Sequence, residues 1–132
     1  KRKKILKKKK IFLVSLKQLL KVSDFIAIAV PLSNETTNLI NKKNLSILKK
    51  NCVLVNISRG GVVNEDHLYE ILIKKKIFAA ATDVFKKEKK FNKLFKLNNI
   101  VVTSHIGAMT YEAQKRIAIM LERKLLKIIN KR

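Results

Sequence analysis

Arg59, Glu88 and His105 are the residues of this sequence whose types could perform acid–base chemistry on an anionic ligand. A guanidinium binds a carboxylate through two parallel hydrogen bonds. An imidazole exchanges protons near neutral pH, and a carboxylate within reach holds the ring in one orientation. Taken singly, each residue has a plainer interpretation, because most arginines are solvated and most lone histidines are structural. The three therefore indicate a site only if the fold brings them together.

Apolar runs of strand length precede these residues and predict the elements that position them. Phe25 to Val30 is a continuous apolar run, which predicts a strand covered on both faces, and Pro31 ends it. Ligands bind beyond the carboxyl ends of such parallel strands, so we expect the three candidate side chains around one cavity at that edge. The other predicted strands are Ile11 to Val14, Cys52 to Ile57, Ile77 to Thr82, and Ile100 to Thr103.

Capping residues predict short helices between the strands. Ser15 and Gln18 have the spacing of a capping box. Asn41 would cap a helix that continues to about Lys49. Asn64 would cap the next helix, which has Glu65 and Asp66 in its first turn and Lys74 to Lys76 in its last, so that charge follows the helix dipole.

A longer helix is predicted from Thr110 onward, where apolar residues recur at helical spacing to Ile129. Its apolar face is broad, which predicts packing against another domain or subunit. Helices that alternate with strands over short connections indicate an α/β fold with a parallel sheet. The predicted fold class is a Rossmann-like, doubly wound parallel sheet that is incomplete.

Small and polar residues beside the candidate side chains add to the predicted site. Gly60 and Gly61 follow Arg59 and would leave the backbone slim enough for close approach by a ligand. Asp83 ends an apolar strand, so a polar ligand or backbone donors should satisfy its carboxylate. His67 is predicted to be structural, and Asn64, Thr36 and Thr37 to be caps and turn formers.

Composition narrows the class of protein. The net charge of +22 would favour binding to nucleic acid. However, Lys, Ile and Asn make up 53 of 132 residues, which is a bias expected of an AT-rich genome. The sequence also contains no motif of a known nucleic-acid-binding fold. Nucleic acid is therefore an unfavoured partner. Cys52 is the only cysteine and is expected to be buried and unreactive. No apolar run is long enough to cross a membrane, so a cytoplasmic protein is expected, and no metal site is predicted.

The ordered motifs resemble those of one family, the D-isomer-specific 2-hydroxyacid dehydrogenases, which includes phosphoglycerate dehydrogenase and glyoxylate/hydroxypyruvate reductase. The motifs are Asn56-x-x-Arg59-Gly60, then Asp83-Val84-Phe85 with Glu88, then His105-Ile106-Gly107-Ala108. Any one of them is weak, but their joint order covers nearly the whole chain. The presence of Glu88 rather than Gln argues against the formate dehydrogenase branch. Phosphoglycerate dehydrogenase is the member slightly favoured.

The resemblance implies a role for each matching residue. Arg59 would bind the substrate carboxylate, His105 would be the general acid/base at the 2-oxygen, and Glu88 would pair with His105. The implied substrate is a 2-hydroxy or 2-keto acid, the implied cofactor NAD with NADP as the open alternative, and the implied assembly of the full-length protein a homodimer. Residues implied to contact the cofactor are Val30, Ile57, Ser58, Arg59, Asp83, His105, Ile106, Gly107 and Ala108.

The sequence also departs from the family pattern. Lys89 and Ser104 stand where the family usually has proline, which predicts looser loops with the reacting groups retained. There is no G-x-G-x-x-G turn, and the first residue is Lys1, so residues 1–132 are expected to be the carboxyl half of an NAD-binding domain without its outer substrate domain. Such a piece alone is expected to fold poorly or aggregate, to bind NAD weakly and to be inactive. A non-catalytic dinucleotide-sensing or corepressor-like module is the alternative function.

Overall fold

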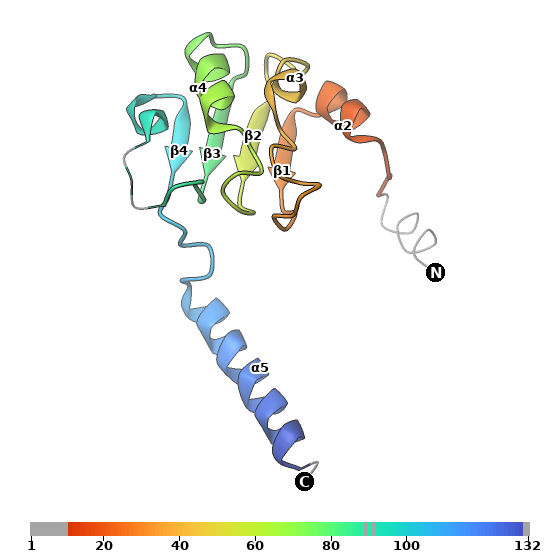
Figure 1. Ribbon diagram of the computed structural model, residues 1–132, viewed down its shortest axis with the longest axis vertical. Coiled ribbons are helices and arrows are strands. Elements are labelled where there is room, and N and C mark those ends of the chain that lie inside the picture. The colour runs from red at the N-terminus through yellow and green to blue at the C-terminus, as the bar shows by residue number, and fades with distance from the viewer. Residues whose placement is uncertain (1–10, 89, 91, 131–132) are drawn as a thin grey trace.

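A parallel β-sheet forms the centre of the molecule, in a computed structural model that describes residues 11–88, 90 and 92–130 (Figure 1). Its strands are arranged in chain order, so each crossover advances the sheet by one position in the same direction. The predicted α/β class with a parallel sheet is confirmed. The strands are β1 (Phe25–Ile28), β2 (Val53–Asn56), β3 (Ala79–Thr82) and β4 (Ile100–Val102).

The strands are shorter than the apolar runs that predicted them. β1 pairs with β2 from Phe25 opposite Val53 to Ile28 opposite Asn56, and there the ladder ends. Val30, Ile57 and Thr103 therefore lie beyond the strands, in the turns at their carboxyl ends. A strand lasts only as long as its neighbour does, so the hydrophobic run overestimates its length.

The predicted helix starts are confirmed at each capping residue. The Ser15 hydroxyl accepts from the Gln18 N–H at 3.2 Å, and the side chains of Asn41, Asn64 and Thr110 each accept from a backbone N–H three residues ahead. These bonds satisfy N–H groups that a helix leaves without an internal partner. The helices are α2 (Leu16–Val22), α3 (Lys42–Leu45), α4 (Glu65–Ile73), the 3-10 helix η1 (Lys93–Lys96) and α5 (Tyr111–Ile129).

Two helices end earlier than predicted. α3 stops at Leu45 instead of near Lys49, because the chain turns through a bond from the Leu48 N–H to the Leu45 carbonyl and then enters the sheet. α4 stops at Ile73, so Lys74 is its C-cap and Lys74 to Lys76 lie after the last turn rather than within it. Lys75 takes a left-handed backbone conformation with φ of 49°, which ends the helix there.

Helices cover only one face of the sheet in the described part of the chain. Along β1 the residues alternate between exposed and buried, with Phe25 at 78% exposure and Ile26 at 5%. The register places Ala27, Val55, Ala81 and Val101 in one row, and Val101 is 67% exposed. The expectation of a strand covered on both faces is therefore wrong for β1 in this structure, whose described helices pack against the other face.

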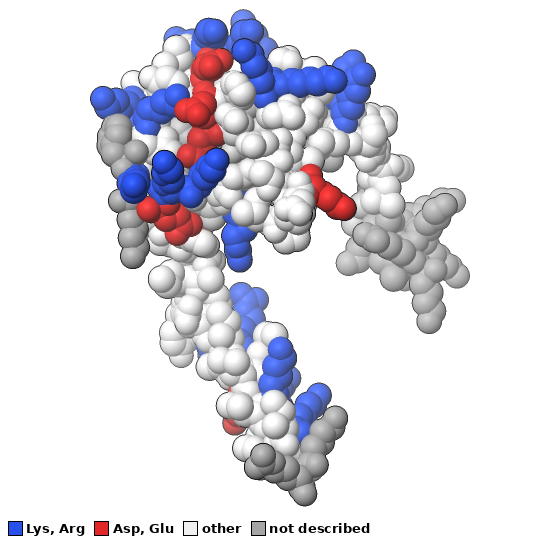
Figure 2. Space-filling view, viewed as in Figure 1, with Lys and Arg blue, Asp and Glu red and all other residues white. Residues whose placement is uncertain are grey.

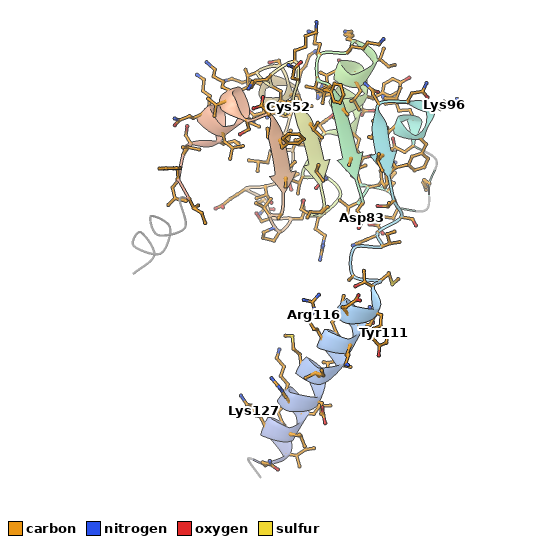
Figure 3. The ribbon with its side chains drawn as sticks, turned by 180° about the vertical axis from the view of Figure 1, so that it is seen from behind. Cys52, Asp83, Lys96, Tyr111, Arg116 and Lys127 are labelled. Carbon is orange, nitrogen blue, oxygen red and sulfur yellow. The ribbon has the colours of Figure 1, made fainter. Side chains whose placement is uncertain are left out.

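α5 extends away from the sheet and buries none of its residues, as Figure 3 shows for the labelled Tyr111, Arg116 and Lys127. The same view places Asp83 at the end of the sheet from which the chain leads into α5. The predicted apolar face is present and exposed. None of the described helices combines the length and the apolar character that a membrane span requires.

Lys and Arg side chains are distributed over several elements, as Figure 2 shows for one face of the molecule. Blue side chains lie over the upper part of the sheet domain and continue along α5, with Asp and Glu between them. On this face the positive charge is not confined to one groove, as expected if it results from composition.

The first predicted strand does not form. Ile11 to Val14 has no strand structure and its side chains are exposed, because a strand requires a neighbouring strand and this segment has none among the described residues. The Lys-rich start of the chain (residues 1–10) and Lys89 lie outside the described residues.

Candidate active site

The candidate side chains follow the carboxyl ends of three neighbouring strands. Arg59 comes three residues after β2, Glu88 lies in the loop after β3, and His105 comes three residues after β4. Parallel strands place all these ends at one edge of the sheet. The common edge is confirmed; whether the side chains share one cavity depends on the loops.

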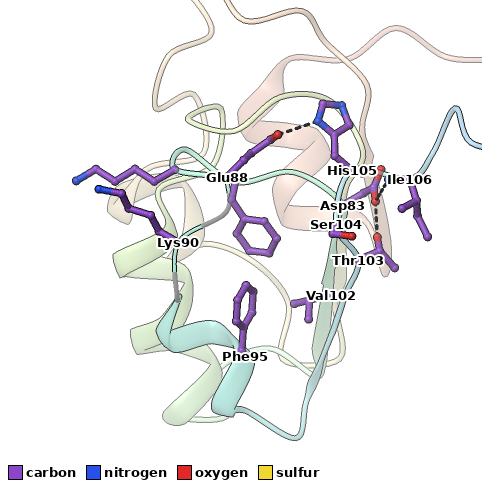
Figure 4. Close-up of a pocket in the computed structure, with 11 residues that line it drawn as sticks. Asp83, Glu88, Lys90, Phe95, Val102, Thr103, Ser104, His105 and Ile106 are labelled. Atoms are coloured by element: carbon purple, nitrogen blue, oxygen red, sulfur yellow. Dashed lines mark hydrogen bonds and ion pairs between the residues drawn. The ribbon is translucent and has the colours of Figure 1, made fainter.

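Glu88 and His105 form a hydrogen-bonded pair at this edge (Figure 4). His105 Nδ1 lies 2.8 Å from Glu88 Oε1, and the two side chains are 43% and 47% exposed. A pair as exposed as this contributes little to stability. It does fix the ring, because one nitrogen faces the carboxylate and Nε2 is left to exchange a proton with a ligand.

His105 has a left-handed backbone with φ of 58°, a conformation that residues with a side chain adopt infrequently. The loop holds it there through the His105 N–H, which donates to the Asp83 carbonyl at 2.8 Å. Strained backbone of this kind persists where the surroundings over-determine it, and such positions cluster at functional sites.

Asp83 ties the His105 loop to the end of β3. Its carboxylate accepts from the backbone N–H groups of Ile106 and Gly107, both at 2.9 Å, and from the Thr103 hydroxyl. Partial burial alone would raise the pKa of the Asp83 carboxyl, but these three bonds and the nearby His105 outweigh it and hold that pKa below its usual value. Of the two predicted partners for Asp83, the structure shows backbone donors.

A cavity of about 830 Å³ lies beside the Glu88–His105 pair (Figure 4). Phe85 and Phe95 form part of its wall, with ring centroids 5.2 Å apart in an edge-to-face arrangement. Asp83 and Ile106 line it as well. The cavity therefore combines an apolar wall with the paired acid and base.

Arg59 lines a different cavity, of about 570 Å³, between the ends of β1 and β2. Its guanidinium donates to the Ser58 carbonyl at 2.7 Å, so it folds back onto its own loop. The expectation of one cavity shared by Arg59, Glu88 and His105 is therefore wrong for this structure. The three residues share an edge of the sheet, and the Arg59 guanidinium bonds within its own loop.

Gly60 allows close packing inside the protein. A Cβ at Gly60 would lie 2.0 Å from the carbonyl oxygen of Phe85 and 2.5 Å from the backbone nitrogen of Lys86. The Arg59 loop therefore packs directly against the backbone of the loop that carries Glu88. Gly61 is required for another reason, a φ of +87°.

The residues predicted to contact the cofactor are divided between these two cavities. Val30, Ile57 and Ser58 line the Arg59 cavity, where Ser58 is buried and its hydroxyl donates to the Asn56 side chain at 2.7 Å. Ile106 lines the His105 cavity. Gly107 packs against Asp83, and the Ala108 carbonyl accepts a hydrogen bond from the Gln114 side chain at 2.7 Å.

These surfaces suit the nicotinamide half of a dinucleotide. Apolar walls such as those formed by Val30, Ile57 and Leu32 accept the face of a flat ring, and the imidazole is placed at the same sheet edge. The residues thus fit a nicotinamide ring, whereas the phosphate-binding glycine turn G-x-G-x-x-G is not in the sequence.

Thr36, Thr37 and Cys52 behave as predicted. The Thr36 and Thr37 hydroxyls donate to the carbonyls of Pro31 and Ser33 and close a turn. Burial, and then the charge of Asp24, raises the pKa of the Cys52 thiol, which is fully buried. His67 Nδ1 is buried and has no hydrogen-bond partner among the described residues, so its predicted structural role stays a prediction. Among the described residues, no three metal-ligating side chains are grouped.

Two contributors to the site were not predicted. Glu65, expected only to favour the start of α4, accepts from the Lys86 N–H and from the Asn92 side chain, both at 2.6 Å. Phe95 lies in η1, a helix for which the sequence gives no clear period. The two contacts of Glu65 join residues 21 and 27 positions apart in the sequence, so local sequence patterns do not predict them.

Comparison with known proteins agrees with this geometry. Residues 1–107 match the family described as D-isomer specific 2-hydroxyacid dehydrogenase, NAD binding domain. Hydroxypyruvate reductase of Thermotoga maritima is 42% identical over 118 residues, which are 86% of this chain and 39% of that protein. D-3-phosphoglycerate dehydrogenase of Methanocaldococcus jannaschii is 42% identical over 113 residues, 85% of this chain and 22% of that protein.

A solved structure gives the same result for the fold. D-Lactate dehydrogenase from Aquifex aeolicus, complexed with NAD and lactic acid, superposes with a TM-score of 0.84 at 29% identity, over 96% of this chain and 43% of that one. The chain thus spans less than half the length of each of these relatives. The chain belongs to the family of NAD-binding domains of D-isomer-specific 2-hydroxyacid dehydrogenases.

Proposed function

We propose that the protein carrying this chain is an oxidoreductase that transfers a hydride between NAD(H) and a 2-hydroxy or 2-keto acid. The observation that carries the proposal is the Glu88–His105 pair, 2.8 Å apart, beside a cavity with an apolar wall. NAD is the cofactor proposed, with NADP as the alternative, and residues 1–132 are proposed to be the carboxyl half of the cofactor domain. The nicotinamide, when bound, supplies or accepts the hydride.

In the reducing direction, His105 would give its proton from Nε2 to the 2-oxygen as C2 receives the hydride. The ketone thereby gains one hydride and one proton and becomes an alcohol. Glu88 keeps the ring oriented through Nδ1 and stabilises the charge that the imidazole carries before the transfer. Oxidation reverses each step.

Arg59 is proposed to bind the substrate carboxylate. Arg59 is an exposed residue at the same sheet edge, and its bond to the Ser58 carbonyl in its own loop can be exchanged for two bonds to a carboxylate. Fixing the acid group on one side and the 2-oxygen on the other would orient C2 for the hydride.

The substrate proposed is a short 2-keto acid. Relatives are named hydroxypyruvate reductase, glyoxylate reductase and D-3-phosphoglycerate dehydrogenase. The acids in these names all have an oxygen at C2 and a carboxylate. Our sequence-based preference for phosphoglycerate belongs to this proposal as one of the acids to be compared. A homodimer is proposed as the assembly of the full-length protein.

A chimera tests the activity. This chain would replace the matching stretch of the Thermotoga maritima hydroxypyruvate reductase, and NADH oxidation would be measured with hydroxypyruvate, glyoxylate and 3-phosphohydroxypyruvate. We expect turnover of at least one acid, and a loss of about 10²- to 10⁴-fold in kcat on His105→Ala. His67→Ala is the matched control and should retain activity.

The same chimera separates the enzyme from a non-catalytic sensor. A chimera that binds NADH and turns over none of the three acids would contradict the proposal. Activity that survived His105→Ala undiminished would contradict the role given to the imidazole.

A further inference from the structure

We infer that Glu65 is a positioning residue: it holds the loop that carries Glu88, and so allows Glu88 to pair with His105. The inference rests on the proposed function only for what the pair does in catalysis. The contacts that support it are independent of any substrate. They connect the first turn of α4 to the loop that carries Glu88.

Both carboxylate oxygens of Glu65 are used in this connection. Oε1 accepts from the Lys86 N–H at 2.6 Å, and Oε2 accepts from the Asn92 side-chain amide at 2.6 Å. Lys86 precedes Glu88 by two residues and Asn92 follows it by four, so the loop is held on both sides of Glu88. Hydrogen bonds to an ionised acceptor are stronger than those between neutral groups.

Asn92 extends the connection into the next element. Its side-chain oxygen accepts from the Leu94 N–H at 3.0 Å, which makes Asn92 the N-cap of η1, and Leu94 is fully buried in the core. The amide group of one side chain therefore joins Glu65 to the start of η1. The carboxyl side of the loop that carries Glu88 is anchored to the core through Asn92.

Gly60 supplies the third contact. The Arg59 loop packs against the backbone at Phe85 and Lys86 so closely that a methyl group at Gly60 would lie 2.0 Å from the Phe85 oxygen. Lys86 is thus held by Gly60 on one side and by Glu65 on the other. The Arg59 loop, which leads into α4, is therefore packed against the loop that carries Glu88.

The Glu88–His105 pair needs such support because it does not hold itself. Its side chains are almost half exposed, and exposed pairs gain little over the entropy of holding two flexible side chains together. Asp66, the next carboxylate in the same turn, differs from Glu65 in that its ion pair is with the side chain of Lys93 in η1. It pairs with Lys93 at 2.7 Å and its side chain is 77% exposed.

Imidazole nitrogen NMR on the chimera described above, in which this chain is part of a complete protein, tests the inference. The ¹⁵N shifts of the His105 ring report whether Nδ1 carries a proton that is held in a hydrogen bond. Glu88→Ala defines the spectrum of the unpaired ring. We expect Glu65→Ala to move the His105 signals at least half of the way to that spectrum.

Glu70→Ala is the matched control, because Glu70 is an exposed glutamate on the same helix that bonds neither Lys86 nor Asn92 in the structure. It should leave the His105 signals unchanged. Glu65→Ala spectra that match those of the unsubstituted chain would overturn the inference.

A rescue keeps the test informative if Glu65→Ala unfolds the chain. Asn92→Asp places a carboxylate against that of Glu65 and should break the pairing. Combined with Glu65→Gln it should restore the pairing, since the new amide can donate to position 92 while its carbonyl accepts from the Lys86 N–H. A double variant that pairs no better than Asn92→Asp alone would also overturn the inference.

The outcome is separable from that of the activity test. Loss of pairing in Glu65→Ala supports the positioning role even if the chimera proves inactive. An active chimera whose Glu65→Ala variant keeps the paired spectrum contradicts the positioning role and leaves the proposed function standing.

Discussion

The carboxylate of Asp83 accepts the backbone N–H of Gly107 at 2.9 Å, across 24 residues of sequence. The same carboxylate accepts the N–H of Ile106, so two successive amides of the His105 loop point at one side chain. Asp83 therefore shapes the loop that presents the imidazole. A Cβ at Gly107 would lie 3.1 Å from the Asp83 carboxylate, which shows how closely the two residues pack.

Acidification should weaken this connection. The pKa of Asp83 is lower in the folded chain than its usual value, so its charged form stabilises the fold at neutral pH. This contribution is fully present above the usual aspartate value of about 3.9 and is lost as the pH falls through the lower folded value. Urea unfolding between pH 2.5 and about 7 should show a steeper acid loss for the unsubstituted chain than for Asp83→Asn. Equal acid dependence of the two would contradict the role of Asp83.

Gly60→Ala should destabilise the chain by more than Gly61→Ala. At position 60 the methyl group meets the Phe85 carbonyl at 2.0 Å, and overpacking of this kind costs about 1–3 kcal/mol or more. At position 61 the nearest atom is 3.9 Å away and only the left-handed backbone is strained, which costs about 1–2 kcal/mol. Denaturant midpoints of the two variants check the order, and the reverse order would mean that Phe85 moves aside at little cost.

Local rules predicted the starts of the helices, because a cap depends on residues three positions apart. Ser15, Asn41, Asn64 and Thr110 accept the predicted bonds. The ends of strands and helices were predicted less well, since they depend on neighbouring elements. Ile57, for example, continues an apolar run but has left the strand.

The sequence predicted which edge of the sheet carries the candidate site, but not how the side chains are arranged there. Parallel strands oblige the residues that follow them to lie at one end of the sheet, which placed Asp83 and His105 correctly. The rotamer of Arg59 and the contact between Gly60 and Phe85 arise from loop packing, which has no sequence period. Glu65 was for the same reason assigned only to the helix dipole.

Arg59→Lys in the chimera should raise KM for the 2-keto acid more than it lowers kcat. Lysine keeps the charge but loses the planar fork that binds a carboxylate through two bonds. The loss expected in kcat/KM is on the order of 10- to 100-fold, about the free energy of one charge-assisted hydrogen bond. Steady-state kinetics with varied keto acid and saturating NADH give the measurement. A KM unchanged by Arg59→Lys would place the carboxylate elsewhere.

The isolated chain should associate, and more strongly as salt is added. β1 is an edge strand with Phe25 exposed, Val101 lies on the open face of the sheet, and α5 leaves its apolar side uncovered. Such surfaces favour association, whereas the net charge of +22 opposes it until salt screens the repulsion. Sedimentation at about 20 mM and about 300 mM salt should show the shift, since the screening length falls below about 10 Å between them. Val101→Lys should reduce it, and Lys50→Gln, a substitution of an exposed residue in the turn before β2, should not. A chain that remains monomeric at the higher salt would show that these apolar surfaces are too small to hold copies together.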